Sequence, residues 1–142
     1  MLIEVRTKVA WVIDGKIRKK TETYILDRET FSLAEQEVIS LLNAYKDEGT
    51  VEYYEIQVMR ISSITEICNQ YQGDISFIAT LRDIVLQDDG TEKQLKYKVL
   101  LWADNISQAM ANTRELASQG YDMQIDSLKE VNYTYLNSQG NN

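Results

Sequence analysis

The residues best suited to chemistry in this sequence are the cations of one predicted hairpin. Between residues 6 and 20, six of them are opposed only by Asp14: Arg6, Lys8, Lys16, Arg18, Lys19 and Lys20. Clustered cations beside an aromatic ring, here that of Trp11, are typical of an anion-binding or nucleic-acid-binding patch. The candidate ligand-binding or nucleic-acid-binding residues are therefore Lys8, Trp11, Lys16, Arg18, Lys19 and Lys20. The structural alternative is a soluble sheet edge with a packed strand tryptophan.

Missing residue types exclude several other chemistries. The sequence has no histidine, which excludes Ser–His and Cys–His nucleophile activation, and a single cysteine, Cys68, cannot build a zinc site. Glu22, Asp27 and Glu29 form a carboxylate cluster, but Glu22 and Asp27 lie five positions apart on a strand and point to opposite faces. We therefore predict no catalytic residues, no metal and no cofactor, with a carboxylate-dependent enzyme as a less favoured alternative.

Composition predicts an ordinary globular protein of the cytoplasm. The chain has 142 residues, of which 44% are hydrophobic and 26% charged, and it contains no apolar run long enough to span a membrane and no secretory signal. One unpaired cysteine fits a reducing compartment. The net charge of −7 argues mildly against coating nucleic acid, whereas the nine tyrosines suit a protein interface or a stacking platform. Sheet edges available for association would allow a homodimer.

Hydrophobic periodicity places the basic residues on a hairpin that precedes a helix. Residues 3–13 alternate as a half-buried strand, Asp14-Gly15 is a strong turn signal, and residues 17–27 form the return strand. Ser32 and Glu35 predict a capping box at the start of a helix that Gly49 ends. A further strand is expected within residues 51–67, with a bulge near Val58, where the apolar spacing changes from two to three.

The same order recurs in the second half of the chain. A strand over 75–86, a turn at Asp89-Gly90, a return strand over 95–102, a helix that Ser107 caps and Gly120 ends, and a last strand repeat the first series. The two series align at an offset of 72 in the first strand, 75 from the turn to the helix, and 67 in the last strand. We predict a first β-β-α-β repeat over 1–68, a connector over 69–74, a second repeat over 75–136 and a disordered tail over 137–142.

The predicted fold class is α+β. Two tandem β-β-α-β repeats should fuse into one pseudo-symmetric body, because each is too small to bury its sheet alone. We expect a mostly antiparallel sheet with two helices on one face.

The segment Thr21–Asp27 (Thr-Glu-Thr-Tyr-Ile-Leu-Asp) followed by Thr30–Glu35 (Thr-Phe-Ser-Leu-Ala-Glu) resembles the signature of a family known as a domain of unknown function. The family occurs in Bacteroidetes and their tailed phages and prophages, and the resemblance covers about residues 3–136. The second repeat departs from the motif at Val99–Asp104. The resemblance implies a mobile-element context in a bacterial host cell and transfers no activity or functional residue.

Together these observations favour a non-enzymatic accessory binding protein of a phage or prophage. Its partner would be a protein or a small nucleotide-like ligand, and inhibition of a host defence system would be one such role. The alternative is a nucleic-acid-metabolism accessory protein that binds DNA through the basic hairpin 6–20. A minor virion component is a further possibility.

Overall fold

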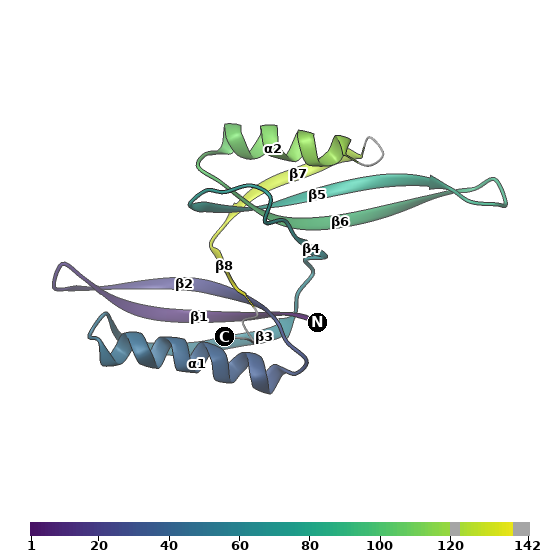
Figure 1. The fold of residues 1–142 in the computed structure, drawn as a ribbon. Coiled ribbons are helices and arrows are strands. Elements are labelled where there is room, and N and C mark those ends of the chain that lie inside the picture. Colours follow the sequence, from purple (N-terminus) through teal and green to yellow (C-terminus); the bar gives the residue numbers. More distant parts are fainter. Residues whose placement is uncertain (120–122, 138–142) are drawn as a thin grey trace. The chain divides into compact units, whose positions relative to one another are not determined.

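The structure, a computed structural model, describes residues 1–119 and 123–137. The predicted helix end at Gly120, and the predicted tail apart from Asn137, lie outside the described residues. In chain order the elements are β1 (Leu2–Ile13), β2 (Lys16–Asp27), α1 (Phe31–Asp47), β3 (Val51–Ile61), β4 (Glu66–Ile67), β5 (Ile75–Leu86), β6 (Glu92–Ala103), α2 (Ile106–Ser118), β7 (Gln124–Val131) and β8 (Tyr133–Leu136) (Figure 1).

The chain folds into two compact units with the same layered design. Unit 1 comprises Met1–Ser62 together with the chain from Asn132 onward, and unit 2 comprises Ser63–Val131. Each holds one four-stranded, mostly antiparallel sheet, in the order β3-β1-β2-β8 in unit 1 and β4-β6-β5-β7 in unit 2. Each sheet carries one helix, so the predicted α+β class and the mostly antiparallel sheets are confirmed. No helix among the described residues is long and apolar enough to cross a membrane.

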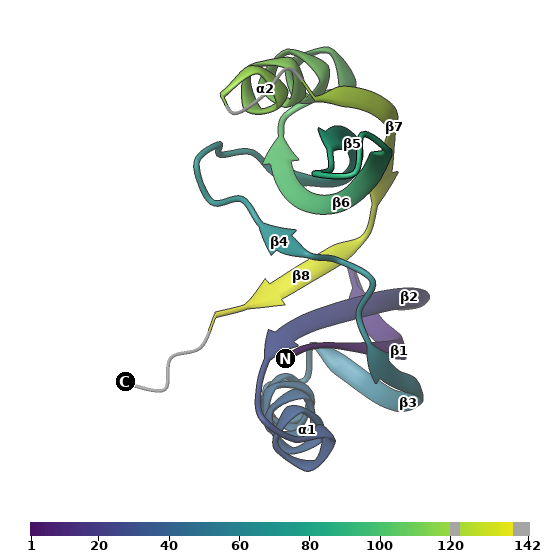
Figure 2. The same ribbon diagram turned by 90° about the vertical axis from the view of Figure 1, so that its right-hand side faces the viewer.

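In both units the core lies between the sheet and its helix (Figures 1 and 2). In unit 1, Ile3, Val5 and Val9 of β1 pack with Val38 and Leu42 of α1. In unit 2, the fully buried side chains between β5, β6 and α2 are Phe77, Ala79, Leu101, Ala103 and Ala109. Strand residues at every second position meet helix residues at spacings of three and four, as amphipathic elements require.

The helix caps lie two residues before the predicted ones. Thr30, not Ser32, caps α1 by accepting a hydrogen bond from the Leu33 amide at 3.1 Å, and Asn105, not Ser107, accepts one from the Gln108 amide at 2.8 Å. Both capping residues are extended, with φ values of −136° and −158°. Each helix therefore begins earlier, because a β-region residue with a side-chain acceptor already stands there.

A glycine with a positive φ angle lies in the turn of each hairpin. Asp14 and Gly15 have φ values of 53° and 75°, as a two-residue type I′ turn requires. The second loop runs from Gln87 to Thr91 and uses Gly90, whose φ is 86°. Strand pairing changes the offset by one residue at this longer loop, from 74 to 75, where the sequence predicted a change of three.

Strand pairing aligns the two series differently from the sequence offsets. The β1–β3 register shifts between Arg6 and Thr7, and the β5–β7 register shifts between Thr80 and Leu81, which gives an offset of 74 (80 − 6). The bulged residues, Gln57 and Asp126, give 69 (126 − 57) for the last strand. The predicted offsets of 72 and 67 were therefore wrong by two. A slip of two residues returns each side chain to the same face, so the hydrophobic pattern could not reveal it.

The fourth strand of each sheet lies outside the β-β-α-β series that forms the rest of that sheet. β4 follows β3 along the chain but pairs in parallel with β6 of unit 2, and β8 follows β7 but pairs in parallel with β2 of unit 1. The compact units therefore do not follow one another along the chain, unlike the predicted repeats 1–68 and 75–136. The connector 69–74 lies within unit 2, where Gly73 approaches the backbone of Ala103 so closely that a Cβ atom would overlap it.

Candidate functional site

The six predicted binding residues lie on both faces of the unit 1 hairpin. Lys20 pairs with Val9 of the core, so Lys20 lies on the face that bears α1, which we name the helix face. The neighbouring pair, Lys19 and Ala10, lies on the opposite face, which we name the outer face. By this alternation Lys8 and Lys19 lie on the outer face, while the helix face holds Trp11, Lys16, Arg18 and Lys20.

Trp11 contributes to the packing of α1 against the sheet. Its ring lies 5.5 Å from that of Tyr45 at an interplanar angle of 56°, and its indole Nε1 donates a hydrogen bond to the Glu22 carboxylate. Stacking on a base would compete with Tyr45 for the indole. These contacts favour the structural interpretation of Trp11 and give Glu22 a structural partner.

Two further sequence candidates, Lys19 and Asp27, have structural contacts, and a third, Cys68, is buried. Lys19 extends its ammonium over the ring of Tyr53, 5.7 Å from the centroid, and Asp27 accepts a hydrogen bond from the Met1 amino group at 2.7 Å. Cys68 is buried in the core of unit 2. Among residues 1–119 and 123–137, no three His, Cys, Asp or Glu side chains converge as metal ligands would.

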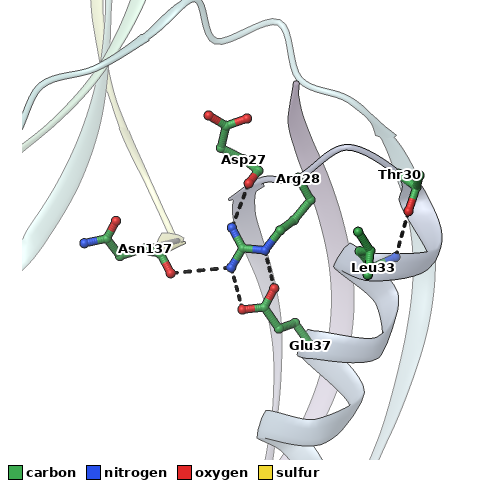
Figure 3. Close-up of polar contacts among 6 residues, drawn as sticks. All are labelled: Asp27, Arg28, Thr30, Leu33, Glu37 and Asn137. Atoms are coloured by element: carbon green, nitrogen blue, oxygen red, sulfur yellow. Dashed lines mark hydrogen bonds and ion pairs between the residues drawn. The ribbon is translucent and has the colours of Figure 1, made fainter. Parts of the chain in front are cut away.

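Arg28 fastens β8 to the rest of unit 1 (Figure 3). Its guanidinium pairs with the Glu37 carboxylate of α1 through two nitrogens and donates to the carbonyl oxygens of Asp27 (2.7 Å) and Asn137 (3.4 Å). The Arg28 side chain is only 12% exposed, and its hydrogen bonds to Glu37 raise its pKa. Because these partners occupy the fork, Arg28 is a structural clamp rather than a ligand site.

A small hollow on the outer face of unit 1 brings together three charged side chains, those of Glu4, Arg6 and Arg60. It encloses about 80 Å³ and is lined by Glu4, Arg6, Thr23, Val58, Arg60 and Tyr133. Strand register explains the grouping, because Arg6 pairs with both Thr23 and Val58, Glu4 pairs with Arg60, and Thr23 pairs with Tyr133. The hollow therefore crosses all four strands of the sheet.

Glu4 forms the floor of this hollow. Its side chain is 5% exposed, and its two oxygens accept hydrogen bonds from Arg60 Nε and Ser62 Oγ, each at 2.9 Å. The Arg60 side chain is 62% exposed, so the guanidinium is anchored at one nitrogen yet accessible to a ligand. A buried carboxylate that holds an accessible arginine is a means of fixing a recognition group in place.

The charged groups of the hollow influence one another. The Glu4 carboxylate raises the pKa of Arg60 through a hydrogen bond and its charge. Burial, followed by the charge of Glu4, raises the pKa of Tyr133, while Arg60 and Arg6 act in the opposite sense. Two arginines against one carboxylate leave the hollow with one net positive charge, so an anionic group is the ligand it favours.

Sequence reasoning did not find this site. Glu4 and Arg6 alternate with core residues and therefore look like an ordinary solvated strand face. The residues that complete the site are distant in sequence: Arg60 is separated from Glu4 by 56 positions and Ser62 by 58. The available signal was a glutamate between two residues of an apolar strand, Ile3 and Val5.

Unit 2 does not repeat the hollow. At the offsets that strand pairing gives, Glu4 corresponds to Ile78, Arg60 to Lys129 and Ser62 to Val131. The buried carboxylate and its hydroxyl donor are thus replaced by two apolar side chains. Within the described residues, this combination of groups belongs to unit 1.

Comparison with known proteins identifies a family without a described activity. The model of the family described as a domain of unknown function (DUF4494) matches residues 4–136, a span that covers most of unit 1, all of unit 2 and every residue that lines the hollow. No curated protein and no solved structure matches the chain.

Proposed function

The chain belongs to DUF4494, and from this premise we propose that it is a non-enzymatic accessory binding protein of a phage or prophage, acting in the cytoplasm of a bacterial host. The proposed binding site is the outer-face hollow of unit 1. The proposed ligand is an acidic segment of a protein partner, which places a carboxylate between Arg6 and Arg60.

The accessible arginine on a buried carboxylate is the observation that carries this proposal. Arg60 is held by Glu4 and stands beside Arg6 and Tyr133, an arrangement that suits recognition of a carboxylate. The charge balance of +1 favours an anion over a cation. Inhibition of a host defence protein would be one role for such contacts.

The size of the hollow favours a protein partner over a small nucleotide-like ligand. Pockets that enclose small-molecule ligands measure roughly 300–1,000 Å³, whereas this one encloses about 80 Å³. A single carboxylate group fits such a space, but a base with its ribose does not. Tyr53 and Tyr133 supply aromatic surface of the kind that protein interfaces favour.

Affinity capture from host lysate tests the proposal directly. The full chain should retain a partner that Arg6→Ala and Arg60→Ala each release, with at least about a tenfold loss of affinity once that partner is purified. Lys129→Ala, at the corresponding position of unit 2, is the matched control and should leave binding unchanged. Equal binding by all four proteins would place recognition elsewhere and refute the proposed site.

DNA binding through the basic hairpin 6–20 is the second candidate. Lys16, Arg18, Lys19 and Lys20 are all exposed, and their number is the observation in its favour. In a mobility-shift titration, this candidate predicts affinity for DNA that falls steeply with salt and disappears when the four cations are reversed. If the protein does not bind DNA even at low salt, this candidate function is excluded.

A further inference from the structure

The ends of the two hairpins carry opposite charges. The basic end, residues 13–20, holds four cations and Asp14, for a net charge of +3. The acidic end, residues 83–95, holds Asp83, Asp88, Asp89 and Glu92 against the single cation Lys93, for a net charge of −3. Each of the two segments forms the closed end of a β-hairpin, and the two carry opposite charges.

Both ends also expose apolar side chains. Ile13 and Ile17 are 41% and 53% exposed at the basic end, and Ile84 and Leu86 are 44% and 72% exposed at the acidic end. Exposed apolar side chains next to complementary charges are a feature of interaction surfaces.

Each end further presents strand edges without a neighbour among the described residues. β8 pairs with β2 only along Thr23–Leu26, so the edge of β2 is open over Lys16–Lys20. β7 pairs with β5 only as far as Arg82, so the edge of β5 is open over Asp83–Leu86. Open edges accept a further strand through backbone hydrogen bonds.

We propose that the basic end of one copy of this chain binds the acidic end of a second copy. Lys16, Arg18 and Lys20 face the carboxylates of the other copy, and the exposed isoleucines and Leu86 shield one another from water. The contact joins two different surfaces. It therefore either closes into a dimer with two equal contacts or extends into a chain of copies. This self-association is independent of the partner proposed for the hollow.

Sedimentation and light scattering of the full chain, freed of nucleic acid, test this proposal. At low salt the mass should rise from 16.4 kDa to at least twice that value as protein concentration increases towards about 1 mM. Added salt should reverse the rise, because it screens exposed charges. A mass that stays at 16.4 kDa throughout overturns the proposal, as does a salt-dependent compaction without any change of mass.

Charge exchange identifies the surfaces. Variant B, Lys16→Glu with Arg18→Glu and Lys20→Glu, and variant A, Asp83→Lys with Asp88→Lys and Glu92→Lys, should each weaken self-association at least about tenfold. Asp89 is retained because its carboxylate accepts hydrogen bonds from the Thr91 amide and hydroxyl that shape the turn.

Mixing the two variants is the decisive measurement. Variant B has two acidic ends and variant A two basic ends, so the mixture should associate again although neither variant does so alone. Lys46→Glu with Arg114→Glu and Lys129→Glu changes net charge as variant B does but leaves both ends intact, and should associate like the parent chain. Circular dichroism confirms folding of each variant. A mixture that stays monomeric, or a control that fails to associate, would overturn the assignment.

Discussion

Units 1 and 2 share their strand order but differ in what the outer face of the sheet presents. Both have a long hairpin, a third strand with a bulge at the corresponding point, a covering helix and a short parallel fourth strand. Unit 1 places a buried Glu4 beneath Arg60, whereas unit 2 places Ile78 beside Lys129. The fold supplies positions, and the residues at those positions create a site in one unit only.

The two hairpins extend the same comparison. One hairpin end is basic and the other acidic, although both follow the same strand pairing. Divergence in charge between the two hairpin ends supplies the two complementary surfaces of the self-association proposed above.

The largest effect is expected from Gly73→Ala, which breaks unit 2. The added methyl overlaps the backbone of Ala103 and should cost about 2–4 kcal/mol of the free energy of unfolding. Gly49→Ala is the matched control: its φ of 82° is strained but its surroundings are open, so about 1–2 kcal/mol is expected.

Each unit holds one tryptophan, so fluorescence during urea unfolding can follow them separately. Trp11 reports unit 1 in a Trp102→Phe background, and Trp102 reports unit 2 in a Trp11→Phe background. Gly73→Ala should lower the midpoint that Trp102 reports more than the midpoint that Trp11 reports. Equal shifts would mean that the units unfold as one cooperative body, which was the expectation from sequence.

A smaller effect is expected from Glu4→Ala, which removes the polar feature that distinguishes unit 1. Loss of the buried carboxylate and its bonds from Arg60 and Ser62 should cost about 1–3 kcal/mol. Glu55→Ala, at an exposed position of β3, should change stability by less than about 0.5 kcal/mol. Urea unfolding measures both, and equal values would remove Glu4 from its role as a buried anchor.

The helix caps should contribute equally in the two units. Thr30→Ala and Asn105→Ala each remove one side-chain acceptor from a helix start, and each should cost about 1 kcal/mol. Ser32→Ala and Ser107→Ala, at the positions predicted from sequence, are the controls and should have little effect. A larger loss from either serine would contradict the cap assignments.

The smallest effect concerns pH. Burial, aided by a hydrogen bond to Glu115, raises the pKa of Tyr71 in unit 2 to about 12. An unfolded tyrosine has a pKa of about 10, so the folded state holds this proton more tightly. Its contribution is complete below about pH 10 and is lost as pH rises towards 12. Tyr71→Phe should lessen the fall in stability over this range, and tyrosinate absorbance should lose one of its late-titrating groups.

Local patterns predicted the elements well, and long-range register decided the rest. Alternation and the turns at Asp14-Gly15 and Asp89-Gly90 predicted the two hairpins, since these signals depend on neighbouring residues. The hollow depends on Glu4 meeting Arg60 across a strand pair, which no local pattern encodes. The capping serines failed because Thr30 and Asn105 are equally good acceptors two residues earlier. The basic hairpin was found as a sequence feature, but its division between two faces required the register.

The pairing of β2 with β8, which lies far along the chain, has a consequence for biosynthesis. β2 is finished by residue 27, yet its partner β8 begins at residue 133, so the first sheet stays incomplete until nearly the whole described chain has left the ribosome. Closing such a loop is slow compared with forming a hairpin. During translation the edge of β2 is exposed along its full length, including Thr23–Leu26, which β8 covers in the finished protein.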